Sequence, residues 1–438
     1  MSYIPHSDYD RISMLEYLGL SSLEDLFHDI SQDLKLNRQL SIPNKLNEHA
    51  LFEFFLKQST ENKDATQLDW FLGAGLYHRY IPSIVGTVLS RGEFLTAYTP
   101  YQPELSQGYL QTIYEFQSMI AGLYAMEVSN ASVYDGATAA VEAALMSAHI
   151  TGRDEVLVSK TVHPHYKDVL QTYCWAASLK FSEISLNEAS SISKDTACLI
   201  QQTPNFFGII EDLKKSRAIT DEQKALLVVV ADPIAMGLLN PPGHYGADIV
   251  VGEGQQLGIP MGFGGPLLGL FTAKKKYIRR MPGRMVGRAK DREARTGYTM
   301  TLRTREQDIR REKATSNICT NQALTALAAT VYLSALGKQG LKSIASSTVQ
   351  NAQYAISVLT KAGAKRKFEG KVFGEFVLEL PKDAAMVRDE LLEHSILAGH
   401  PLGDIDSDLK NCLLVAVTEL QTKKQIDRFA AKLKEVIA

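Results

Sequence analysis

The residues best suited to chemistry follow two apolar runs near the middle of the chain. Leu226–Ala231 is purely apolar and ends at Asp232-Pro233, and a second run, Asp248–Gly252, is followed by a loop that begins with Glu253. Short apolar runs bounded by Gly or Pro are typical of buried strands. Leu267–Phe271 is expected to be the strand after the loop. Because ligands of parallel sheets bind beyond the carboxyl ends of the strands, we expect Asp232, with Gln202 and Asn205, to lie at a binding site.

The loop between these strands offers Glu253, Gly254, Gln255 and Gln256, but no lysine. A carboxylate at a strand end, then a strand, a loop and another strand, is the order found in pyridoxal-phosphate (PLP) enzymes of the aminotransferase type. There the Asp pairs with the ring nitrogen, and a lysine in the loop carries the cofactor as a Schiff base. We therefore expect a chain that is built around cofactor chemistry it cannot complete alone. Metal chemistry is not indicated, because the four cysteines are scattered without a CxxC pair.

Strands and helices alternate through the centre of the sequence. Further strands are expected at Glu155–Ser159, Leu179–Ile184 and Ala197–Gln201, and this alternation predicts an α/β fold with a mostly parallel sheet and helices on both faces. A helix ends at Gly337, and another runs from Ser343 to about Ala362. We predict three parts: an N-terminal helical arm and loop (1–90), a large domain (91–362) and a small C-terminal α/β domain (363–438).

Two segments could contact a cofactor directly. A helix is expected to begin near Asp135, and the small and hydroxyl residues from Ser132 to Thr138 would form an anion cradle at its N-terminus, although an ordinary helix cap has the same residues. His163 follows a strand and opens a helix with Pro164. It could stack on a planar ring, or it could simply cap that helix.

A loop rich in tyrosine and glutamine precedes the first long helix. Pro100, Pro103 and Gly108 rule out a continuous helix there. Polar residues crowded into a loop are either a binding surface or part of a structural turn that packs on the next helix. The candidates for binding are Tyr98, Tyr101, Gln102, Ser106 and Gln107.

Charge is nearly balanced over the whole chain, with 47 Lys and Arg against 49 Asp and Glu, which argues against a nucleic-acid or membrane-surface protein. The start lacks a basic flank and an apolar core, and no apolar run approaches the ~20 residues of a membrane span, so we expect a cytoplasmic protein. The stretch Lys274–Lys313, however, has 15 basic and five acidic residues. It is either a solvated face or a landing zone for an acidic partner.

Several long motifs together resemble the P-protein family of the glycine cleavage system, glycine dehydrogenase (decarboxylating). More narrowly, they resemble the alpha chains (subunit 1) of the form in which the enzyme is divided between two chains. The resemblance covers nearly the whole sequence, and the motifs are GAGLYHRYIP, FLTAYTPYQPELSQGYLQ, NASVYDGATAAVEAALM, ADIVVGEGQQLGIPMGFGGPLLGLF and TREQDIRREKATSNICTNQAL.

The resemblance implies the PLP-dependent aspartate-aminotransferase fold (fold type I). In the family the companion beta subunit, glycine dehydrogenase subunit 2, carries the Schiff-base lysine. Aligning the shared Pro260 to Pro266 frame puts Gln255 at the lysine position. An amide is not a nucleophile toward an aldehyde, so PLP would be held covalently by the partner, and this chain would have no catalytic residue of its own. The resemblance implies that Ser132, Thr138, His163, Asp232 and Gln255 are a vestigial cofactor cup.

By resemblance, the whole enzyme decarboxylates glycine on PLP and passes the aminomethyl group to the lipoyl arm of the H-protein. Tyr98, Tyr101, Gln102, Ser106 and Gln107 would form a wall of the partner's site, and this chain alone would be inactive. The alternative is a scaffold that stabilises the beta subunit and docks the H-protein, for example on Lys274–Lys313. An independent PLP enzyme would need a Schiff base on one of Lys274 to Lys276. The sequence departs from the family at His78 and Arg79, where Asp and His are more usual, and at His165, where Glu is more usual.

Overall fold

The structure is a computed structural model, and it describes residues 5–186 and 192–438. Residues 1–4 lie outside these ranges. The prediction that the chain has no signal peptide rests partly on them. The chain divides into two compact units, residues 1–63 and 64–438. The predicted boundary of the arm was residue 90, so the observed division falls earlier in the chain.

The first unit contains short helices whose described side chains are all at least partly exposed. Its elements have clear helix-start signals, such as the capping box formed by Ser7 and Asp10 and the Asn47 side chain that accepts a hydrogen bond from Ala50 N–H. No residue described in these helices is buried, and large apolar side chains such as Tyr17 (92% exposed) face solvent. The elements are α1 (Asp8–Leu18), η1 (Leu23–Phe27), η2 (Gln32–Leu34) and α2 (Glu48–Ser59).

A seven-stranded sheet forms the centre of the second unit, in the order β2-β8-β7-β6-β5-β3-β4. Neighbouring strands are parallel from β4 to β7, and only β8 runs against its neighbours. The strands are β2 (Val128–Ser129), β3 (Glu155–Ser159), β4 (Lys180–Ile184), β5 (Thr196–Thr203), β6 (Leu226–Ala231), β7 (Ile249–Glu253) and β8 (Gly269–Ala273). The predicted mostly parallel α/β sheet is therefore confirmed.

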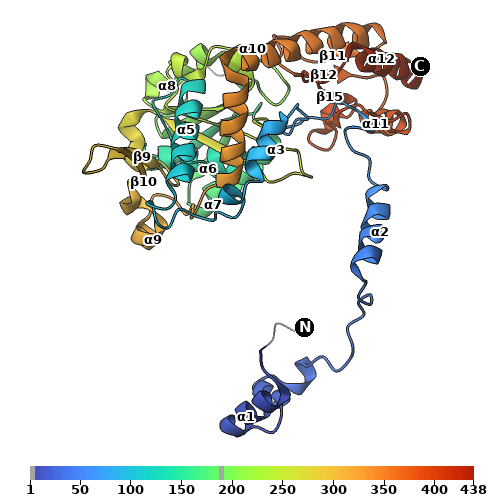
Figure 1. Ribbon diagram of the computed structural model, residues 1–438. Helices are drawn as coiled ribbons and strands as arrows, with labels where there is room; N and C mark the ends of the chain where they lie inside the picture. The colour runs from blue at the N-terminus through green and yellow to red at the C-terminus, as the bar shows by residue number, and fades with distance from the viewer. Residues whose placement is uncertain (1–4, 187–191) are drawn as a thin grey trace. The chain divides into compact units, whose positions relative to one another are not determined.

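Helices cover both faces of this sheet, because its central strands are apolar on both sides. Val228 and Val230 of β6 pack in one core with α6 and α7, whereas Leu227 and Val229 pack in another with α5 and the first part of α10. Figure 1 shows α5 beside α10 on this second face. The helices of this layer structure are α3 (Ser83–Leu89), α4 (Gly92–Leu95), α5 (Gln107–Leu123), α6 (Gly136–Thr151), α7 (Pro164–Ala176), α8 (Leu213–Gln223) and α10 (Ala323–Lys361).

A smaller antiparallel sheet, in the order β11-β12-β15-β14, forms a C-terminal lobe with its own apolar core. The segment at Phe71 belongs to this core: Phe71 is fully buried against Phe429, and β1 (Asp69–Trp70) pairs with β13. The lobe contains β11 (Lys365–Arg366), β12 (Glu375–Glu379), α11 (Ala384–Glu393), β13 (Ile396–Leu397), β14 (His400–Pro401), β15 (Cys412–Ala416) and α12 (Lys423–Ile437). The predicted domain boundary at residue 363 stays a prediction.

Most predicted elements agree with the structure to within a few residues, and Gly337 breaks α10 as expected, with φ 59°. The sequence analysis missed a hairpin within Lys274–Lys313, formed by β9 (Val286–Lys290) and β10 (Thr296–Met300). The same stretch contains the short helix α9 (Gln307–Arg310). Among the described helices, none combines the length and apolar content that crossing a bilayer requires.

Candidate functional site

A half-open pocket lies at the carboxyl ends of the parallel strands. Asp232 follows β6, Glu253 ends β7, Gln202 lies in β5 and His163 follows β3, and all four line the pocket. The pocket encloses about 630 Å³ of space not filled by atoms, part of it open to solvent. The prediction that Gln202, Asn205 and Asp232 meet at this edge is confirmed, because all three line the same pocket.

Asp232 accepts three hydrogen bonds from the chain's own donors. Its Oδ1 accepts hydrogen bonds from the Ile234 and Ala235 N–H groups at 2.8 and 2.9 Å. Its Oδ2 accepts one from Gln256 Nε2 at 2.8 Å. Because the Gln256 amide is buried, and its Oε1 accepts from Arg79 Nε at 2.6 Å, both ends of the amide are fixed.

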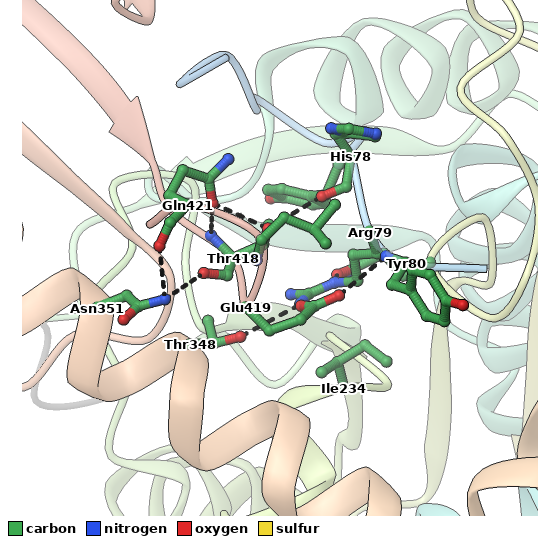
Figure 2. A network of polar contacts seen from close by, with 12 residues as sticks. His78, Arg79, Tyr80, Ile234, Thr348, Asn351, Thr418, Glu419 and Gln421 are labelled. Atoms are coloured by element: carbon green, nitrogen blue, oxygen red, sulfur yellow. Dashed lines mark hydrogen bonds and ion pairs between the residues drawn. The ribbon is translucent and has the colours of Figure 1, made fainter. Parts of the chain in front are cut away.

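Arg79 continues this chain of contacts to the C-terminal lobe. Its Nη1 lies 2.6 Å from Glu419 Oε2 and 3.2 Å from Thr348 Oγ1, and the two charged side chains are only 4% and 12% exposed. Figure 2 shows Arg79 between Glu419 and Thr348, with Glu419 also accepting from Tyr80 N–H. Removing either partner of such a buried ion pair strongly destabilises a protein, because the remaining charge is left buried without compensation.

Glu253 lies at the N-terminus of α6, where the sequence predicted an anion cradle. One carboxyl oxygen accepts from Gly136 N–H, and the other accepts from Gln255 and Leu268 N–H, each at 2.9 Å. Burial raises the pKa of Glu253 to about 7, although the three N–H groups favour the ionised form. The cradle is therefore already occupied by a side chain of this protein.

His163 both caps a helix and lines the pocket, so neither of its two predicted roles excludes the other. Its Nδ1 accepts from His165 N–H at 3.1 Å, and its Nε2 lies 2.9 Å from the Ala74 carbonyl oxygen, which requires a proton on Nε2. Burial lowers the pKa of His163 to about 4. The imidazole is thus neutral at physiological pH, and it lines the pocket as an uncharged aromatic ring.

A second buried carboxyl, Glu375 of β12, closes the pocket from the C-terminal lobe. It accepts hydrogen bonds from Ala74 N–H and from the Tyr77 hydroxyl, both at 2.7 Å. Burial raises its pKa to about 7. The segment that carries Tyr77 and Arg79 therefore joins the main sheet to the lobe across the pocket.

Three residues of the predicted cup lie outside the pocket lining. Gln255 is buried, but its amide is paired with the backbone of Tyr77 and with the Ile259 carbonyl oxygen. Ser132 Oγ accepts from Gln322 N–H at the start of α10, and Thr138 N–H is bound by the Asp135 cap. Of the two adjacent glutamines in this loop, Gln256 lines the pocket and Gln255 does not.

The tyrosine loop lies away from this pocket, since none of its five candidate residues lines it. Tyr98 and Tyr101 are each 77% exposed, and Gln102 is exposed as well. Gln107 has a structural role, because its amide is paired with both backbone groups of Tyr298 in β10 at 2.8 Å. Ser106 is the residue before α5 and is half-buried.

The basic stretch Lys274–Lys313 is not uniformly solvated. Lys274 Nζ lies 2.6 Å from the buried carboxylate of Asp248, and the buried Arg305 guanidinium donates to backbone carbonyl oxygens, including that of Gly283 at 2.6 Å. The hairpin tip is different. Arg288, Lys290 and Arg292 are exposed there, and within the described part of the chain they form no ion pair.

Comparison with known proteins identifies the family to which this fold and sequence belong. The family described as Glycine cleavage system P-protein matches residues 1–433. This chain belongs to the P-protein family. P-protein relatives named "Probable glycine dehydrogenase (decarboxylating) subunit 1" are 48% identical to it: one from Geobacillus sp. (strain WCH70), covering 98% of both chains, and one from Desulforamulus reducens, covering 99% of both.

Solved structures give the same result. A crystal structure of glycine decarboxylase (P-protein) of the glycine cleavage system, in inhibitor-bound form, is 41% identical, covers 100% of both chains and has a TM-score of 0.89. A glutamate decarboxylase from Lactobacillus brevis, only 14% identical, covers 93% of this chain and 96% of its own with a TM-score of 0.66, which supports the fold alone. The P-protein chain described here therefore has the fold of PLP-dependent type I enzymes.

The residues present in the pocket of this P-protein chain do not fit PLP. The donors that would receive a phosphate hold Glu253, and the carboxylate that would receive a ring nitrogen holds Gln256. Lys274 cannot provide a Schiff base to this pocket, because it follows β8 beside the start of β7, at the sheet edge opposite to Asp232. Lys276 lies near Lys274, with its ammonium over the ring of Tyr277.

Breaking the buried pair at Arg79 should destabilise this chain strongly. We expect Arg79→Gln to cost about 3–5 kcal/mol of unfolding free energy, because Glu419 keeps its charge without a partner. The double variant Arg79→Gln/Glu419→Gln should lose clearly less than the sum of the two single variants. The exposed pair Arg91–Glu93 is the matched control, and Arg91→Gln should change stability by about 1 kcal/mol or less. Urea unfolding measures all four, and additive losses in the buried pair would contradict the expectation.

Stability should depend on pH through Glu375. Its pKa is about 7 in the folded chain against a usual 4.5, so the native state binds more protons than the unfolded state between these values. The stabilising contribution is therefore present at low pH and is lost as pH rises through 7. Glu375→Gln should match the wild type near pH 5 and exceed it by up to roughly 3 kcal/mol at pH 8.

The difference between the two unfolding profiles isolates Glu375 from its neighbours. His163, with its lowered pKa, contributes the opposite slope in both proteins. A constant difference from pH 5 to pH 8 would show that Glu375 does not titrate in this window.

Proposed function

We propose that this chain is the lysine-free subunit of a two-chain glycine decarboxylase in the cytoplasm. Its partner, glycine dehydrogenase subunit 2, would hold PLP covalently. The two chains together would decarboxylate glycine and pass the aminomethyl group to the lipoyl arm of the H-protein. The proposal rests on Gln255, which the family resemblance places at the position of the cofactor lysine, in a chain that matches the P-protein family over nearly its whole length.

In this proposal the chain lends part of its surface to the active site of the partner. PLP, when bound by the partner, supplies the electron sink for loss of the carboxylate as CO2. Tyr98, Tyr101 and Gln102 are exposed and unused by the pocket of their own chain. Their hydroxyl and amide groups would orient glycine or the lipoyl arm, and their rings would exclude water from the reacting bond.

The anchoring of this loop supports the proposal, since a wall must be held in place to orient a substrate. Gln107 joins one end of the loop to the backbone of β10, and Arg284 Nη1 donates to Thr99 Oγ1 at 2.5 Å near the other end. Exposed side chains on an anchored backbone are what a shared site requires.

A second candidate function is a scaffold that stabilises the beta subunit and docks the H-protein. The exposed tip of the β9–β10 hairpin favours it, because the unpaired cations of Arg288, Lys290 and Arg292 would attract an acidic surface. The two functions are compatible in one chain, but their substitutions affect different steps.

The first experiment is to reconstitute this chain with glycine dehydrogenase subunit 2. PLP absorbance and exchange of labelled CO2 with glycine should be measured for each chain alone and for the mixture. We expect cofactor absorbance in the partner only and full exchange in the mixture only. Glycine turnover by this chain alone would refute the proposal.

Tyr101→Ala in the reconstituted pair tests the shared wall. We expect glycine decarboxylation to fall by about 10- to 100-fold, because misplacing reactants by an ångström has effects of that size. Assembly with the partner, followed by gel filtration, should be unchanged. The matched control is Trp175→Ala, an exposed aromatic (81%) at the end of α7, which should keep wild-type rates. Equal rates in both variants would refute the wall.

Charge reversal at the hairpin tip tests docking of the H-protein. Arg288→Glu/Lys290→Glu should raise the KM for H-protein by about tenfold and make it less sensitive to salt, while leaving kcat nearly unchanged. The control is reversal of Lys434, a lysine in the last turn of α12. An unaltered KM would remove the hairpin as a docking site.

A further inference from the structure

The pocket contains side chains of this protein at both places where a PLP cofactor makes its polar contacts. A phosphate group needs free N–H donors, which a helix N-terminus offers, and a protonated ring nitrogen needs a carboxylate. At the start of α6, Gly136 N–H is bound by Glu253 and Thr138 N–H by Asp135, at 2.9 and 2.7 Å. Two carboxyl groups thus stand where a dianion would have to enter.

Glu253 is held by three separate segments, so it cannot simply turn aside. Its N–H donors come from α6, from the loop after β7 and from the residue before β8. The space around the helix start is also filled. A Cβ atom at Gly136 would lie only 2.0 Å from the Tyr166 hydroxyl and 3.1 Å from the Glu253 Cβ atom. The site of the phosphate is therefore crowded as well as occupied by a carboxyl group.

The place of the ring nitrogen is taken in the same way. Gln256 Nε2 donates to Asp232 Oδ2 at 2.8 Å, which is the contact that a pyridinium N–H would make. Arg79 can only donate, so its hydrogen bond to Gln256 Oε1 fixes the amide with the nitrogen toward Asp232. Among the described residues that line the pocket, Arg79 is the one Lys or Arg side chain, and Glu419 already neutralises it.

We infer that Glu253 and Gln256 are built-in substitutes for the phosphate and the ring nitrogen of PLP, and that they exclude the cofactor from this chain even as a non-covalent ligand. The glutamine at position 255 is then only one of three barriers. A lysine at position 255 does not restore cofactor binding while the two substitutes remain. This inference concerns the chain alone and does not depend on any partner subunit.

The test is uptake of PLP by the purified full-length chain, by equilibrium dialysis and by borohydride reduction followed by peptide mass spectrometry. The variants are Gln255→Lys, Glu253→Ser/Gln256→Ser and the triple combination. Pyridoxal, which lacks the phosphate, is the second probe. The matched control is Glu142→Gln, which removes another buried carboxyl whose pKa is raised to about 7 from the interior of α6.

We expect no saturable PLP binding by the wild type, by Gln255→Lys or by Glu142→Gln. The Glu253→Ser/Gln256→Ser variant should bind PLP saturably, with a dissociation constant at least about tenfold below the highest concentration at which the wild type shows no saturation, and more tightly than it binds pyridoxal. Only the triple variant should show a reduced adduct on the peptide that contains residue 255.

Three results would overturn the inference. One is saturable PLP uptake by the wild type that inorganic phosphate displaces. Another is an adduct at residue 255 in the single Gln255→Lys variant, and these two decide the matter even if the serine variants fail to fold. The third is a Glu253→Ser/Gln256→Ser variant that folds, by circular dichroism, and still rejects PLP.

Discussion

A buried polar group must have a partner, and this constraint governs the whole carboxyl edge of the central sheet. In an enzyme with a bound cofactor, some of those partners belong to the cofactor. Here the chain provides them itself: Gln256 for Asp232, Arg79 for Gln256, and Glu419 for Arg79. The last contact lies in the C-terminal lobe, so the need to satisfy one carboxylate at the end of β6 also joins the two lobes. Glu375 closes the same connection from β12 by binding Ala74 and Tyr77.

Much of this fold could be predicted from local patterns, because apolar runs and Gly or Pro boundaries fix strands such as Glu155–Ser159 and Leu226–Ala231 within a residue or so. The position of Asp232 at a pocket followed from the rule for parallel strands. The Arg79–Glu419 pair could not be predicted, since its partners are 340 residues apart and no local pattern links them. Alignment to the family frame found the loop at Gln255, but it could not show that the next glutamine faces the pocket. That depends on how the backbone turns after β7.

The N-terminus of α6 illustrates why a sequence signal can be read correctly and still be incomplete. Small residues and a cap at Asp135 do make a place for an anion. The acceptor is Glu253, which lies more than a hundred residues further along the chain. It reaches the start of α6 because it is the last residue of β7, a strand of the central sheet. A motif therefore defines the donors, whereas only the tertiary structure identifies the acceptor. The hairpin β9–β10 was missed for a different reason: its two strands are mostly exposed, with Val286 alone buried in them, so no alternation of apolar and polar residues marks them in the sequence.

The short helices of residues 8–59 have well-formed starts but bury none of their described residues. Isolated helices of 11 or 12 residues are marginal in water, and most helical stability in proteins comes from packing. A copy of the chain with this segment uncovered would therefore present aromatic and leucine side chains, Tyr17 and Phe52 among them, to proteases and chaperones. The rate at which a cell degrades such an uncovered copy would be set by this segment rather than by the well-packed sheet. The amount of this chain that a cell makes would then have to match the amount of whatever partner covers the segment.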